Sequence, residues 1–114
     1  MCYAMPAAEA VSTRTLPMTF RSRPLLDACR QLECAHCGID DGTVVAAHSN
    51  SLADGKGKGI KSSDSAVASL CFTCHQMLDQ GKDLSKEERR EMWLAAHVRT
   101  LRQLIERGIL KVAK

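Results

Sequence analysis

Residues 71–75 read CFTCH, a pattern that fits two different chemistries. Cys-x-x-Cys-His attaches a c-type haem, whereas Cys-x-x-Cys alone is half of a zinc site. A second pair of cysteines lies upstream in ECAHCG, 33–38, and a lone haem motif would leave that pair unexplained. Two such pairs provide four thiolates, which close the shell of one tetrahedral zinc and mark it as structural. The sequence therefore predicts a structural Zn²⁺ held by Cys34, Cys37, Cys71 and Cys74.

The size and composition of the chain support a metal-stapled domain. The sequence has 114 residues, with one Trp, one Tyr and two Phe, so it has room for one small domain with a limited apolar core. We find no secretory signal and no apolar run of about 18 residues, and therefore expect a cytoplasmic protein without membrane association. Cysteine pairs in a reducing cytosol usually bind metal. A cysteine-based redox protein is disfavoured, because no βαβ pattern surrounds either pair.

The residues that typically begin and end helices, strands and loops predict a tail over residues 1–22 and one domain over residues 23–114. Pro24 opens a short helix, PLLDACRQLE, with apolar residues at helical spacing. We expect strands at TVVAAH, 43–48, and AVASL, 66–70, joined by a Gly- and Lys-containing loop. A helix then starts at CFTCHQMLDQ and ends at Gly81.

The last predicted element is a helix that starts at the capping box Ser85–Glu88 and ends at Gly108. Its apolar stripe is assigned to the core and comprises Met92, Trp93, Ala96, His97, Leu101, Leu104 and Ile105. We expect His97 to be packed within this stripe, and His36 to face solvent. The arginines of the helix alternate with acids and are interpreted as its solvated face. A stripe this wide could also serve a homodimer.

The order of these elements resembles the zinc-containing HNH nucleases, whose ββα-metal site carries a His on a strand and a His on the following helix. More closely, LECAHCG, VVAAHSN, the Gly/Lys loop, Asp64, ASLCFTCHQMLDQ and ERGILKV resemble, in that order, the prophage-encoded YbcO family of predicted nucleases. The resemblance covers about residues 25–112. It implies a small α+β fold, with an HNH-like ββα-metal core pinned by a four-cysteine zinc knuckle and flanked by an N-terminal and a long C-terminal helix.

The resemblance also implies an activity, that of a metal-dependent DNA endonuclease of phage origin that works in the bacterial host cell. Its substrate would be duplex or branched DNA. His48 falls on the general base, and His75 falls on the helix histidine that binds a catalytic Mg²⁺ or Mn²⁺. Asp79 lies one helical turn after His75 and is a further candidate ligand, as is Asp64 from the end of the loop.

Two positions depart from the family pattern and keep a second function open. The residue before the base is commonly a metal ligand but is Ala47 here, and the usual Asn upstream of the second cysteine pair is Ala66. The alternative is a non-catalytic, zinc-stabilised module that binds DNA or a protein. The net charge of +3 supports nucleic-acid binding only mildly. The candidate phosphate contacts are Lys56, Lys58 and Lys61 in the loop, which could equally be solvated.

Overall fold

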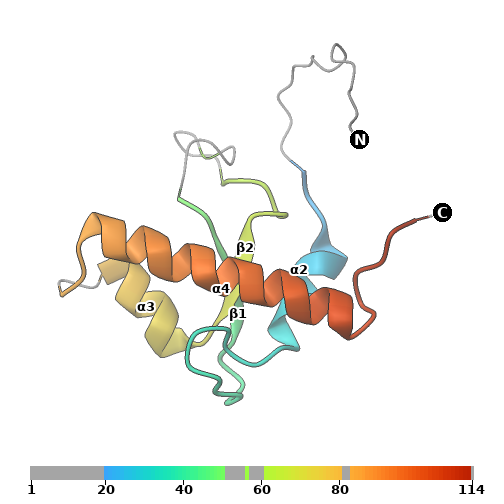
Figure 1. Cartoon of the computed structure of the whole chain (residues 1–114), viewed down its shortest axis with the longest axis horizontal. Helices are drawn as coiled ribbons and strands as arrows, with labels where there is room; N and C mark the ends of the chain where they lie inside the picture. The colour runs from blue at the N-terminus through green and yellow to red at the C-terminus, as the bar shows by residue number, and fades with distance from the viewer. Residues whose placement is uncertain (1–19, 51–55, 57–60, 81–82, 114) are drawn as a thin grey trace, which may run out of the picture.

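The computed structural model describes residues 20–50, 56, 61–80 and 83–113, and Figure 1 traces their path. Helix α2 (Arg23–Arg30) is followed by strands β1 (Val45–His48) and β2 (Val67–Leu70). Helices α3 (Phe72–Gln80) and α4 (Lys86–Glu106) complete the order. The expected small α+β fold is therefore confirmed for the described residues, as three helices around a two-stranded sheet.

The sheet is an antiparallel pair in which Val45 lies opposite Leu70 and His48 lies opposite Val67. Every residue of β2 is buried, whereas only Ala47 is buried in β1. A strand that is buried on both faces must satisfy its polar side chains internally. Ser69 does so with its hydroxyl, which donates to the Cys29 carbonyl at 2.8 Å.

Helix α4 crosses in front of both strands and covers β2 (Figure 1). Its capping box forms as expected, because the Ser85 hydroxyl accepts from Glu88 N–H and the Glu88 carboxylate accepts from Ser85 N–H. The buried residues Ala96, Thr100 and Leu104 follow each other at four-residue intervals and face the sheet. His97 is packed as predicted, with Nδ1 2.8 Å from the Val67 carbonyl.

The predicted core stripe of α4 is too wide. Leu101 and Ile105 are 41% and 55% exposed, because the face that meets β2 is centred on Thr100 and Leu104. With Leu94 and Val98 they form an exposed apolar row at intervals of four, three and four residues. The homodimer expected through this helix would use this row, and it stays a prediction.

The N-terminal part of the described chain joins the domain earlier than the sequence suggests. Ser22, assigned to the tail, is the N-cap of α2, and its hydroxyl accepts from Leu25 N–H at 3.3 Å. The Phe20 carbonyl accepts from Asp64 N–H at 3.0 Å. Residues 20–22 therefore form a short strap, which is bonded to the segment that precedes β2.

Within the described residues, no helix is both long enough and apolar enough to cross a membrane.

Candidate functional site

The two cysteine pairs meet in space, although Cys37 and Cys71 lie 34 positions apart in the sequence. The sulfur atoms of Cys34, Cys37, Cys71 and Cys74 all lie within 4.8 Å of one another. A tetrahedral Zn²⁺ with Zn–S bonds of about 2.3 Å requires sulfur atoms about 3.8 Å apart. The Cys37 and Cys71 sulfurs are 3.7 Å apart, so this cluster fits the predicted structural zinc.

The local backbone explains how the first pair converges. Gly38 has φ +82°, a left-handed conformation that other residues rarely adopt, and its N–H donates to the Cys34 carbonyl at 2.9 Å. This tight turn brings the N–H groups of His36 and Cys37 to 3.4 Å from the Cys34 sulfur. The second pair starts α3, since His75 N–H donates to the Cys71 carbonyl at 2.9 Å.

The electrostatics of the cluster favour a bound cation. Burial raises the pKa of the Cys34 thiol, but hydrogen bonds from the backbone N–H groups of Cys37, Cys71 and His36 outweigh burial and lower the pKa to about 6. Burial raises the pKa of Cys74, and the neighbouring cysteines raise it further. One thiolate therefore forms readily and opposes the next, and a divalent cation would offset this repulsion.

Removing a ligand should remove both the metal and the fold. Cys34→Ser and Cys74→Ser are expected to lose a single tightly bound zinc and cooperative thermal unfolding. Structural zinc contributes about 10–16 kcal/mol, as much as the whole stability of a small domain. Metal analysis after dialysis and circular dichroism melting measure both effects.

Cys29→Ala is the matched control, because Cys29 is buried outside the cluster. It should lower the melting temperature modestly and keep one zinc per chain. Wild-type-like melting of the ligand variants would contradict the zinc assignment.

His48 ends β1 and pairs with Asp64. Its Nε2 lies 2.7 Å from Asp64 Oδ1, and the two side chains are 18% and 6% exposed. A buried carboxylate is stable only when its oxygens have partners, and Asp64 has several. Ser22 N–H donates to Oδ2 at 2.8 Å, and the Arg21 guanidinium lies 3.2 Å from Oδ1.

The strap fixes this carboxylate in place. The Arg21 guanidinium also donates to the carbonyl oxygens of Ser62 at 2.6 Å and Lys61 at 2.9 Å. Burial raises the pKa of Asp64, but the hydrogen bond with His48, the Ser22 N–H and the charges of His48 and Arg21 together lower it below its ordinary value. Asp64 is therefore a carboxylate that orients His48.

Asp64 should stabilise the fold in a pH-dependent way. Because its pKa is lower in the folded chain, its contribution is complete above the ordinary value of 3.8 and is lost as pH falls through the folded pKa. Asp64→Asn is expected to cost about 1.5–3 kcal/mol at neutral pH, the range for hydrogen bonds to a charged group.

Chemical denaturation at pH 7, with zinc content determined on the same samples, measures this difference, because acid would also protonate the thiolate ligands and release zinc. Asp27→Asn serves as the control, since Asp27 is exposed and its surface ion pairs contribute little. Equal free energies of unfolding for wild type and Asp64→Asn at pH 7 would contradict this account of Asp64.

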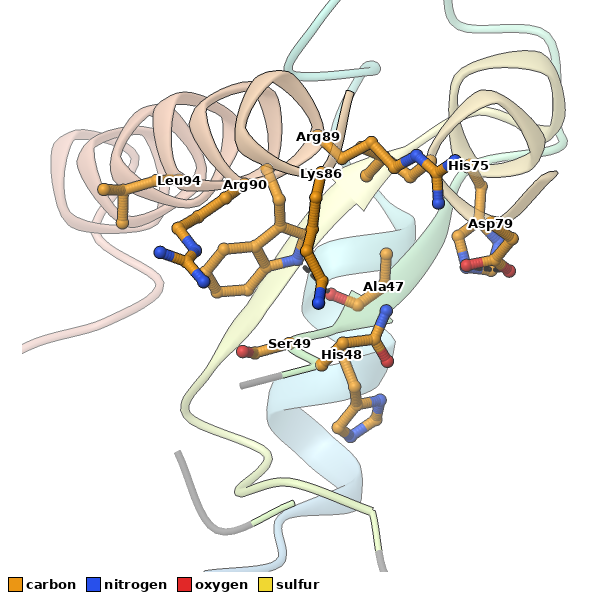
Figure 2. Close-up of a pocket in the computed structure, with 12 residues that line it drawn as sticks. Ala47, His48, Ser49, His75, Asp79, Lys86, Arg89, Arg90 and Leu94 are labelled. Carbon is orange, nitrogen blue, oxygen red and sulfur yellow. Dashed lines mark hydrogen bonds and ion pairs between the residues drawn. The ribbon is translucent and has the colours of Figure 1, made fainter. Parts of the chain in front are cut away.

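A pocket of about 380 Å³ lies beside His48, and its lining residues are drawn in Figure 2. Strand β1 and the residues after it contribute Ala47, His48, Ser49 and Asn50, and α3 contributes His75, Leu78 and Asp79. On α3, His75 Nε2 lies 3.5 Å from Asp79 Oδ2, as the four-residue spacing predicts. The pocket thus brings the two predicted catalytic histidines to one cavity.

The structure separates other candidates from this pocket. Asp64 contacts His48 and the strap and is absent from the pocket lining, so it lies apart from His75 and Asp79. Lys61 is exposed and its carbonyl binds Arg21, and Lys56 is half-buried. Lys58 lies outside the described residues. Ala66 is buried in the core, beside the start of β2.

The sequence interpretation missed the third wall of the pocket. Helix α4 contributes Lys86, Arg89, Arg90, Trp93 and Leu94. These residues recur at three- and four-residue spacing and so share one helix face. Trp93 Nε1 donates to the Ala47 carbonyl at 3.0 Å, which attaches this face to β1 beside His48. This spacing is the sequence signal that could have identified the face, but it is hard to recognise because basic and acidic residues are mixed along the helix.

Comparisons with known proteins establish only the fold. No protein-family model and no curated protein matches the chain. A solved structure from Escherichia coli str. K-12 substr. MG1655, described provisionally as that of a bacteriophage protein, is 22% identical, with a TM-score of 0.52. The similarity covers 73% of this chain and 98% of that chain. At this identity, the likeness is one of fold alone.

Proposed function

We propose that the protein is a metal-dependent endonuclease of the HNH type, which hydrolyses phosphodiester bonds in DNA. The observation that carries the proposal is the His48–Asp64 pair, with a distance of 2.7 Å, at the edge of a pocket that also contains His75. A histidine oriented by a buried carboxylate is the usual arrangement of a general base. The four-cysteine cluster would serve as scaffold, because four thiolates leave zinc no open position.

His48 would remove the proton from the attacking water. Asp64 accepts a hydrogen bond as a carboxylate, so the Nε2 atom of neutral His48 carries the proton and Nδ1 presents its lone pair. After proton transfer, the imidazolium is stabilised by the same carboxylate. Arg21 keeps Asp64 charged and in place, and is therefore a positioning residue.

His75 and Asp79 would hold the catalytic cation, since one imidazole nitrogen and one carboxylate lie on the same face of α3. Mg²⁺ commonly binds one or two protein ligands and takes its remaining ligands from water and phosphate. When bound, Mg²⁺ or Mn²⁺ would stabilise the charge that develops on the leaving oxygen. The similar fold of the E. coli protein described as a phage protein supports a phage-derived role for this chain.

His48→Ala should abolish most of the cleavage and leave the fold intact. Loss of a general base lowers the rate by about 10²- to 10⁴-fold. Nicking of a supercoiled plasmid with Mg²⁺ or Mn²⁺ measures the rate, with zinc content and melting temperature measured on the same samples. His36→Gln is the matched control, because His36 is exposed and lies outside the pocket.

His75→Ala should differ from His48→Ala in its dependence on metal. Removing a ligand weakens cation binding, so a higher Mn²⁺ concentration should restore part of the cleavage. Excess Mn²⁺ should not restore His48→Ala. Equal cleavage by His48→Ala and wild type would refute the proposed base, and loss of zinc from His75→Ala would show that His75 was assigned to the wrong metal.

A non-catalytic zinc module that binds DNA or a protein is the second candidate, and specific features favour it. Ala47 offers no ligand where the family commonly has one. Among the described residues, the cysteine cluster is the one group that brings three or more ligand-type side chains together. In Figure 2, the imidazole of His48 points away from His75 and Asp79. A wild-type protein that binds DNA but cuts neither duplex, junction nor single strand would identify this second function.

A further inference from the structure

The first two turns of α4 present a row of positive charge to the pocket. Lys86, Arg89 and Arg90 line it together with Trp93. The acidic residues of the same turns, Glu87, Glu88 and Glu91, are exposed and absent from the lining. The helix therefore separates its charges by face, although they alternate in the sequence.

The three cations are spread across the cavity. In Figure 2, the Arg89 side chain extends toward His75 and Asp79, Lys86 points toward the middle near Ala47, and Arg90 lies at the end near Leu94. Among the described lining residues, Asp79 alone carries a carboxylate. The lining therefore carries a net positive charge, and a chain of phosphates would neutralise it along its length.

We propose that Lys86, Arg89 and Arg90 bind successive backbone phosphates of a nucleic-acid strand that lies along the first two turns of α4. This inference rests on the proposed function in one respect, that the strand would present a phosphodiester to His48 in the same pocket. The inference places the main contact surface on α4, whereas the sequence predicted phosphate contacts from the lysines of the loop.

The chemistry of these side chains suits phosphate. Arginine donates from a planar fork to two phosphate oxygens, and lysine adds a compact point charge. The capping box already occupies the N–H groups of Ser85 and Glu88, and the contacts proposed here come from side chains. Trp93 holds this face against β1 through the Ala47 carbonyl, which fixes the cations relative to His48.

The test is equilibrium binding of a fluorescein-labelled DNA oligonucleotide of about 20 nucleotides, single-stranded and duplex, measured without added divalent cation so that cleavage plays no part. Lys86→Gln/Arg90→Gln should bind about tenfold more weakly for each lost contact. The slope of log K against log salt for the duplex should fall by about 1.8, since each phosphate contact contributes about 0.9. Arg102→Gln/Lys111→Gln removes the same charge from exposed positions outside the pocket and should change both quantities little.

The outcomes separate this inference from the proposed function. Wild-type binding that the pocket variant loses supports the inference, even if no cleavage is found. Equal losses in the two double variants would mean a non-specific charge effect and overturn it. Loss of binding in Lys56→Ala/Lys58→Ala/Lys61→Ala, with none in the pocket variant, would assign the strand to the loop. Absence of wild-type binding to either DNA would also refute the inference.

Discussion

The convergence of four cysteine sulfurs is the constraint on which the rest of the structure depends. The cluster joins the turn after α2 to the start of α3, and the two strands lie between these points. The sheet has only two strands, each of four residues, and a pair of this size is marginal by itself in water. A structural metal at the base of the hairpin would therefore fix the register of the strands, and with it the position of His48 at the end of β1.

Asp64 provides a second junction at the other end of the hairpin. It binds His48 from β1, Arg21 and Ser22 from the strap, and lies shortly before β2. The hydrogen bonds of this buried carboxylate fix the segment before β2, which lies beyond the paired residues of the two short strands. The residues that surround the proposed base are therefore also residues that stabilise the fold, and Asp64 variants should be judged by stability as well as by activity.

Helix α4 connects the core to the pocket. One face packs Ala96, Thr100 and Leu104 on β2, and the face of its first turns lines the cavity with Lys86 and Arg90. Because one rigid helix carries both sets, packing of its central turns positions charges at its N-terminal end. This arrangement allows a small domain with little apolar material to hold the proposed binding surface in a defined place.

The sequence by itself determined the local features. Spacing within each Cys-x-x-Cys pair, the Ser85 capping box and the one-turn spacing of His75 and Asp79 along α3 all reflect interactions within a few residues, which short-range geometry dictates. It also predicted the type and order of the elements, with boundaries within a few residues. The nuclease activity, the cation and the DNA partner came from a resemblance and remain predictions.

Only the tertiary structure decided which distant groups meet. Asp64 was a candidate metal ligand in the sequence, yet its carboxylate bonds to His48 and Arg21, because the strap folds across the end of the loop. Leu101 was assigned to the core but is exposed, since the narrow sheet covers less of α4 than its apolar stripe allows. Arg89 and Arg90 were interpreted as part of the solvated face, because a sequence shows the periodicity of a helix but not which of its faces closes a pocket.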